Sequence, residues 1–382
     1  MIINRLAWRQ LTSEKLRLLA AGAGITFAVL LQLMQFGFRD ALYTSATLVH
    51  SRLLADLVMT SPQYEFIISP GSFPKQRLRE AMQFKEVESV SSLEMGIVPF
   101  RDPLSRKDRQ VLMLAFNPDE PVFDLTLMNT DASKLRVADA VFVDARSRAD
   151  VRPVIEYVQR EGSIRADVAG RRVDVAGLVE FGVSFTGNAN MVTNDATFRK
   201  FIHRPEGPAE IGLLRLKPGS SVDAVQAALT ATLPPDVKIM TPQQFADLEL
   251  SYWNKNSPIG FVFNLGVVVG LMVGAVIVYQ ILYTDVSDHL PEYATLKAMG
   301  YRDRALSLVV LQQSLILSVV GFPIGYVLAE GLYALARQAT GLPIIMTLSR
   351  VVLVFGLTVA MCGGSGLLAI RKLKSADPAD AF

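Results

Sequence analysis

The residue types that most often carry chemistry are few and scattered in this chain. Its three histidines, His50, His203 and His289, lie far apart and none has the spacing of a metal-ligand pair. The single cysteine, Cys362, excludes an intrachain disulfide and a cysteine-based metal cluster. The chain contains no Gly-x-x-x-x-Gly-Lys-Ser/Thr phosphate loop and no Gly-x-Ser-x-Gly nucleophile turn. We therefore expect a chain that is not an enzyme, needs no cofactor or metal, and does not itself hydrolyse ATP.

The composition of the chain points to a membrane protein. Of its 382 residues, 51% are hydrophobic and only 19% are charged, against about 25% in ordinary soluble domains, and the mean hydropathy is +0.32. The net charge of +2 gives no electrostatic reason to expect a nucleic-acid partner. The apolar residues are concentrated in separate runs, which excludes a simple cytosolic enzyme.

Four apolar runs are long enough to cross a bilayer as helices: residues 18–38, 259–283, 305–328 and 351–370. None contains Asp, Glu, Lys or Arg, and each can span a hydrocarbon layer of about 30 Å at about 1.5 Å per residue. Spanning helices are favoured because lipid offers no partner for an unpaired backbone amide. The alternative, buried core helices of a soluble protein, leaves too little polar sequence to wrap them.

The basic residues beside these runs set the expected orientation. Ten Lys or Arg residues lie within residues 1–17, 284–304 and 371–382, whereas the segment 329–350 contains only Arg337 and Arg350. The positive-inside rule then places both termini and the 284–304 loop in the cytoplasm, and residues 39–258 and 329–350 outside. A cleaved signal peptide is an alternative for the first run, but its length exceeds the usual apolar stretch of about 7–15 residues.

Residues 39–258 form the large segment between the first two runs, and their pattern predicts an α+β domain. Strands are expected at 64–68, 111–116, 173–179, 211–216 and 237–240. A helix over 222–233 makes the last two strands part of a βαβ-type unit. Thr241 is the expected N-cap of a further helix, with Pro242 at its first position and Gln244 completing a capping box.

Two further features concern the segments that connect this domain to the first two spans. Residues 39–57 are expected to continue the first spanning helix upward, so the domain stands on two helical stalks. Tyr252 and Trp253 precede the second span, where they fit either aromatic anchors at the membrane interface or side chains packed in the stalk base.

A glycine repeat in the second span predicts close helix packing. Gly266, Gly270 and Gly274 recur every fourth residue, so they share one helix face on which another backbone can approach closely. The partner helix is either the first span, which carries Gly22, Gly24 and Ala28, or the same helix of a second copy.

The 284–304 loop contains a short segment with helix composition. Pro291 suits a first turn, Glu292 favours the positive end of a helix, Lys297 favours the other end, and Gly300 suits the position after it. Such a helix would present Tyr293, Leu296 and Met299 to a partner; the alternative is a plain interfacial turn.

This segment, Glu292-Tyr293-Ala294-Thr295-Leu296-Lys297-Ala298-Met299-Gly300-Tyr301, resembles the Glu-hydrophobic-x-x-Leu-Lys/Arg-Ala-hydrophobic-Gly signature of MacB/FtsX-type permeases of ABC transporters. The ending Asp377–Phe382, the start Ala7–Leu11, and the layout of one span, a large domain and three spans are similar to the same family. Residues 34–42 and Tyr252-Trp253 most resemble the DevC group, permeases of heterocyst-type glycolipid exporters. Pro291 departs from the family, which commonly has Arg before the Glu.

The resemblance implies a role for each part of the chain. The segment Glu292, Tyr293, Leu296, Lys297, Met299, Gly300 and Tyr301 would be the coupling helix that docks on a separate ABC ATPase. Two permeases and two ATPases would form a unit in the inner membrane, working by mechanotransmission. A DevC-like system would add a periplasmic adaptor (membrane fusion) protein and an outer-membrane channel, with lipid or glycolipid as cargo. Two alternatives stay open: an FtsX-like regulatory permease that activates a cell-wall hydrolase, and a lipoprotein-releasing permease.

Overall fold

The computed structural model describes residues 15–120, 122–124, 127–128, 130–184, 187–202, 208–299, 301 and 303–374, with side chains described for all of these except 15–17, 294, 297, 298, 303–306 and 371–374. The chain divides into two compact units. The helical unit comprises residues 1–40, 259–336 and 344–382, and the α+β domain comprises residues 41–258 and 337–343.

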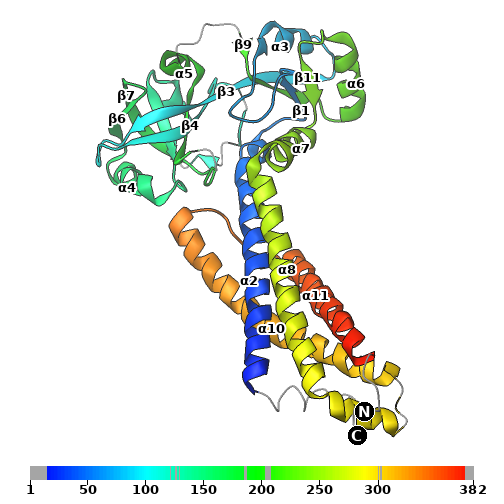
Figure 1. Ribbon diagram of the computed structural model, residues 1–382. Helices are drawn as coiled ribbons and strands as arrows, with labels where there is room; N and C mark the ends of the chain where they lie inside the picture. The colour runs from blue at the N-terminus through cyan, green and yellow to red at the C-terminus, as the bar shows by residue number, and fades with distance from the viewer. Residues whose placement is uncertain are drawn as a thin grey trace. The chain divides into compact units, whose positions relative to one another are not determined.

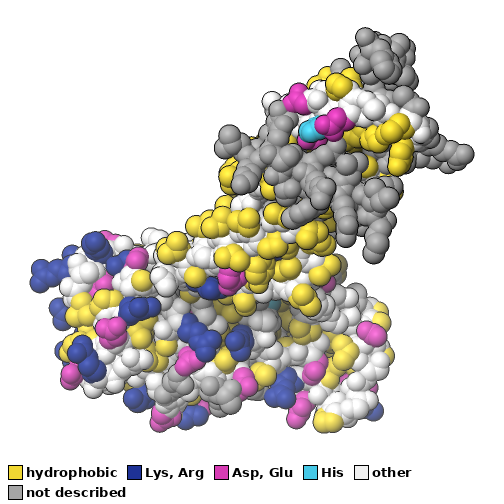
Figure 2. Space-filling view, turned by 90° about the horizontal axis from the view of Figure 1, so that it is seen from below, with side chains coloured by type: hydrophobic (Ala, Val, Ile, Leu, Met, Phe, Trp, Pro, Cys, Tyr) yellow, Lys and Arg dark blue, Asp and Glu magenta, His cyan; other side chains and the backbone are white. Residues whose placement is uncertain are grey.

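The helical unit is built from long apolar helices. They are α2 (Lys15–Ala46), α8 (Pro258–Asp288), α10 (Asp303–Thr340) and α11 (Leu348–Lys374), with the short α9 (Leu290–Ala298) between α8 and α10. All four long helices are long and apolar enough to cross a membrane. Figure 2 shows hydrophobic side chains gathered over the helices, whereas charged side chains are spread over the α+β domain. The expected class, membrane helices with an inserted α+β domain, is confirmed.

The helices extend beyond the apolar runs that revealed them. The third run was expected to end at Leu328 and to give way to a loop over 329–350, but α10 continues to Thr340. Residues 329–340 are rich in Ala and Leu, which favour helix, so Glu330 ends the charge-free run without ending the helix. Likewise α8 continues past residue 283 and includes Asp285.

The α+β domain is organised by one mixed β-sheet (Figure 1). Among the described residues it has nine strands in the order β11-β1-β10-β3-β4-β8-β5-β7-β6. The bounds are β1 Leu57–Thr60, β3 Val87–Arg101, β4 Asp108–Phe116, β5 Ala140–Asp144, β6 Ile164–Val168, β7 Arg171–Val179, β8 Ala189–Asn194, β10 Ile211–Leu216 and β11 Lys238–Met240. A small separate pair joins β2 (Phe73–Pro74) to β9 (Pro208–Ala209).

The long strand β3 belongs to both lobes of this sheet. Its first half pairs with β10, whereas its second half pairs with β4 and, at Phe100, with Val168 of β6. The pairing with β6 closes a ring, because β6 is also the last strand of the series that starts at β4. Alternate residues of β4 enter different cores: Val111 and Met113 join one buried cluster, and Leu112 joins the other.

Helices cover both lobes. They are α4 (Arg152–Glu161) and α5 (Asp195–Ile202) beside the ring, α3 (Gln76–Ala81) and α6 (Val222–Thr232) in the other lobe, and α7 (Pro242–Ser251) before α8. Short 3-10 turns lie at His50–Arg52, Ala132–Arg136 and Ala149–Val151, and a π-helical segment lies at Tyr252–Asn256. The expected β-α-β unit is β10, α6 and β11, with β1 inserted antiparallel between the two strands.

Two expectations for this domain were wrong. Residues 64–68 form no strand, because the backbone amides of Tyr64 and Ile67 bond within the loop or to a side chain instead of a neighbouring strand. Helix α2 ends at Ala46, and Leu57 begins β1, so the first stalk is shorter than the expected 39–57.

The start of α7 agrees with its sequence signals in detail. Thr241 Oγ1 accepts from the Gln244 amide at 3.2 Å, and the Gln244 side chain accepts from the Thr241 amide at 3.0 Å. This capping box, with Pro242 in the first turn, confirms the expected helix start.

We expect Thr241→Ala to weaken the first turn of α7 by about 1 kcal/mol, because the Gln244 amide loses its acceptor. The measurement is hydrogen exchange of that amide in the full chain. Thr230→Ala on α6 is the control, since its hydroxyl bonds only to the Gln226 carbonyl within the helix. Equal exchange at Gln244 in wild type and Thr241→Ala would contradict the assignment.

Candidate functional site

The segment expected to couple to a partner forms α9 and the residues after it. Met299 is 65% exposed and Tyr301 46% exposed, and Glu292 is exposed as well. Leu296 is half-buried against the helical core. Gly300 and the side chain of Lys297 lie outside what the structure describes.

Tyr293 does not behave as expected. Its side chain is 0% exposed and belongs to the same buried cluster as Val286 and Val310. The expectation that it is presented to a partner is therefore wrong, because the ring supplies the apolar face that holds α9 against the helical unit. Met299, Tyr301 and Glu292 remain available on the surface of this segment.

A buried polar group fixes the junction between α8 and α9. Asp285 is 6% exposed, and its Oδ2 accepts a hydrogen bond from Gln313 Nε2 of α10 at 3.0 Å. The next turn is continuous, because the His289 amide donates to the Asp285 carbonyl and the Tyr293 amide to the His289 carbonyl, each at 3.1 Å. The backbone therefore connects α9 directly to α8, and the Asp285–Gln313 hydrogen bond connects α8 to α10.

The glycine face of α8 packs on α2 of the same chain. A Cβ on Gly266 would lie 2.5 Å from Gln35, and one on Gly270 would lie 3.2 Å from Leu31. A Cβ on Gly274 would lie 2.6 Å from the Cβ of Ala28. Of the two alternatives, the structure shows the first span against all three glycines, and Met361 of α11 also lies 2.5 Å from a Cβ on Gly274.

We expect Gly274→Ala to force α2 and α8 apart and to cost about 1–3 kcal/mol of stability. The new methyl group meets Ala28, whose Cβ cannot move without its backbone. Gly356→Ala on α11 is the control, since its added Cβ has nothing within 4 Å. The measurement is thermal unfolding in detergent, and equal melting of the two variants would contradict the packing.

A second polar cluster joins three helices of the helical unit and was not anticipated from the sequence. Arg350 of α11 is 5% exposed, and its guanidinium donates to Asp40 of α2 at 2.8 Å and to the Tyr333 hydroxyl of α10 at 3.2 Å. The Tyr333 hydroxyl in turn donates to the Leu33 carbonyl. Gly37 leaves room for the tyrosine ring, since a side chain there would overlap it.

The α+β domain contains a buried carboxylate with an unusually full set of donors. Glu249 of α7 is 0% exposed. Its Oε2 accepts from the Tyr64 hydroxyl at 3.0 Å and the Ile67 amide at 2.9 Å, and its Oε1 accepts from Trp253 Nε1 at 2.9 Å. His50 Nε2 lies 3.7 Å from the same carboxylate. Trp253 is therefore packed inside this domain and is not an aromatic anchor at the membrane interface.

Burial dominates the protonation of this cluster. Desolvation raises the pKa of Glu249 to about 7, against the opposing hydrogen bonds from Trp253, Tyr64 and Ile67. Desolvation also lowers the pKa of His50 to about 3, so the imidazole is neutral and the 3.7 Å contact is not an ion pair. The pKa of Tyr64 is raised by burial and by Glu249.

These shifts predict an alkaline loss of local stability. The pKa of Glu249 is higher when folded, so its contribution is complete below about 4.5 and is lost as pH rises through about 7. The lowered pKa of His50 has the opposite effect, but only below its ordinary 6.5. Glu249 alone would speed up the intrinsic-rate-corrected exchange of the Ile67 amide about tenfold between about pH 6 and pH 8, and His50 offsets about fourfold of this, so the expected net increase is about twofold. In Glu249→Gln only the opposing His50 effect remains, so exchange should slow over this pH range, and an equal increase in both proteins would contradict the assignment.

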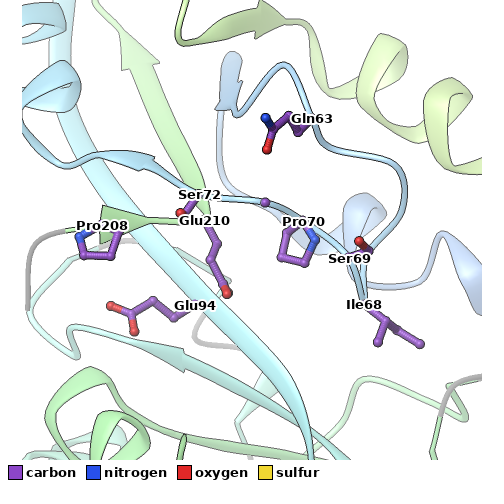
Figure 3. Close-up of a pocket in the computed structure, with 9 residues that line it drawn as sticks. Gln63, Ile68, Ser69, Pro70, Ser72, Glu94, Pro208 and Glu210 are labelled. Carbon is purple, nitrogen blue, oxygen red and sulfur yellow. The ribbon is translucent and has the colours of Figure 1, made fainter. Parts of the chain in front are cut away.

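A polar cavity of about 450 Å³ lies in the α+β domain (Figure 3). Gln63, Ser69, Ser72, Glu94 and Glu210 contribute its polar groups. Both carboxylates have partners: Glu94 pairs with Arg199 at 2.8 Å, and Glu210 accepts from the Met95 amide at 2.7 Å. The cavity therefore offers hydrogen-bonding groups, and its two carboxylates are bonded to residues of the same domain. Across the described residues, no group of three His, Cys, Asp or Glu comes together to hold a metal ion.

A known family model matches part of the helical unit. Residues 264–378 match the model of the FtsX-like permease C-terminal domain, a stretch that contains most of α8 and all of α9, α10 and α11. This stretch, 115 of the 382 residues, is therefore similar to the C-terminal domain of FtsX-like permeases.

Two solved structures are similar to part of the chain at low identity. The periplasmic region of MacB from Actinobacillus actinomycetemcomitans is 10% identical, with 52% of this chain and 94% of that one covered and a TM-score of 0.39. The extracellular domain of the noncanonic ABC-type transporter YknZ from Gram-positive bacteria is 12% identical, with 49% and 99% covered and a TM-score of 0.35.

Proposed function

We propose that this chain is the membrane subunit of an ABC exporter of the MacB/FtsX type. Its α+β domain lies outside the cytoplasm, both termini lie inside, and a separate ATPase docks on the segment around α9. The observation that carries the proposal is the FtsX-like match over 264–378, which contains a short helix with one buried and one exposed side.

The proposed docking surface consists of Glu292, Met299 and Tyr301. An exposed methionine and tyrosine are typical of the apolar, polarizable anchors found at protein interfaces. Tyr293 anchors α9 from behind, and Asp285 bonds to Gln313, so a push on the surface is delivered to two long helices. Leu296, Lys297 and Gly300 stay in the proposed segment on the resemblance alone.

The mechanism we propose is mechanical coupling. ATP binding and hydrolysis in two ATPase copies would move the helices of two permease copies, and the covalent links at α2 and α8 would carry that motion into the α+β domain. A periplasmic adaptor, an outer-membrane channel and a lipid or glycolipid cargo complete the DevC-like version of the proposal. A hydrolase-activating role is the outcome to accept if the assembly forms but exports nothing.

We expect Met299→Asp to reduce capture of the ATPase by more than about tenfold, because a charge replaces an apolar contact in the docking surface. The measurement is affinity purification of the full chain from native membranes, followed by ATP hydrolysis of the captured complex. Met82→Asp is the matched control, since Met82 is 46% exposed in the α+β domain. Equal capture by both variants would exclude docking at Met299, and a wild-type chain that captures no ATPase would exclude the proposed function.

A further inference from the structure

The two ends of the α+β domain are joined inside that domain by contacts that the proposed coupling does not yet use. The Tyr43 hydroxyl, near the end of α2, donates to Asn254 Oδ1 of the π-helical segment at 3.2 Å. His50 follows α2 and packs on Phe245 of α7, with ring centroids 4.4 Å apart. The segments that leave α2 and enter α8 therefore touch each other directly.

The loop 61–69 is fastened to the same place by aromatic contacts. Phe66 stacks on Tyr252 with ring centroids 4.1 Å apart and an interplanar angle of 8°, and meets Trp253 edge-on at 5.9 Å. Tyr64 packs on Phe245 with centroids 5.0 Å apart. This loop follows β1 directly, so it links the joint to the sheet.

Glu249 is the group that these pieces share. Its two oxygens take donors from the loop, through Tyr64 and Ile67, and from the π-helical segment, through Trp253. A buried carboxylate is costly unless it is bonded in this way, so the three donors and the acceptor hold one another in place. A π-helical segment is itself rare and often marks a functional site.

Resting on the proposed function, we propose that Glu249 is a positioning residue that makes the joint rigid. The joint comprises the end of α2 with His50, the loop 61–69, and α7 with the π-helical segment. Because of this joint, a movement of α2 and a movement of α8 are both transmitted to the sheet. Neither is taken up by bending of the segment that connects the helix to the sheet. Without the joint, motion of the helices reaches Pro258 and Ala46 but is absorbed before β1 and α7.

The test measures whether a nucleotide-dependent change in hydrogen exchange at α9 also occurs in the strands of the α+β domain. Hydrogen exchange is measured on the complete permease–ATPase complex, with and without a non-hydrolysable ATP analogue, over α9 and over the strands β1 and β10. Glu249→Gln replaces an acceptor oxygen with an amide that faces donors, so it breaks at least one of the three bonds. We expect the nucleotide-dependent change to persist at α9 and to fall at least about fivefold at β1 and β10.

Two further variants keep the test decisive. Asp247→Asn changes an exposed carboxylate on the same helix and should leave the response of β1 intact. Trp253→Phe keeps the aromatic contact and removes one bond, so it should give a smaller loss, and it replaces Glu249→Gln should that variant fail to fold. An undiminished response of β1 in Glu249→Gln or Trp253→Phe would overturn the joint. A wild-type complex with no nucleotide response at α9 would overturn the proposed function instead.

Discussion

The constraint on which the rest of this structure depends is that a large domain is inserted between two helices that pack tightly together. Glycines on α8 bring its backbone close to α2, and a Cβ at Gly274 has no room beside Ala28. A domain inserted at such a pair must return its chain to the point where it left. The α+β domain does so, since Tyr43 at its start bonds to Asn254 at its end.

Sequence patterns revealed the elements whose stability is local. The capping box at Thr241 and the strand at 211–216 were predicted because each is specified by neighbours within a few residues. The strand expected at 64–68 is absent for the opposite reason. Its alternating residues suit a sheet, but Glu249, 182 residues from Ile67 along the chain, accepts the Ile67 amide that a neighbouring strand would have used.

The candidate site was predicted in outline only. The sequence located α9 and the glycine face of α8, but it assigned Tyr293 to the surface although the ring is buried. A helix of nine residues has too few positions for periodicity to decide which side faces the core. Glu249 was missed because a single Glu on a helix suggests an exposed position. Its one local signal is Trp253 four residues later, a spacing that places an indole donor on the same helix face.

The polar contacts of α10 support the assignment of its helix as a membrane span. Gln313, which bonds to Asp285, and Tyr333, which bonds to Arg350, are separated by 20 residues, or about 30 Å at about 1.5 Å per residue. That distance matches the thickness of a hydrocarbon layer of about 30 Å, so each charged group falls where water and head groups begin. The stretch between them contains one charged residue, Glu330, three positions before Tyr333, and it includes Pro323 and the packed glycines 321 and 325. Since one contact ties α10 to α8 and the other ties it to α2 and α11, the helices are fastened to one another at both edges of this layer. Such an arrangement suits a bundle that shifts as a body, because opening a polar path between its helices would require both contacts to break.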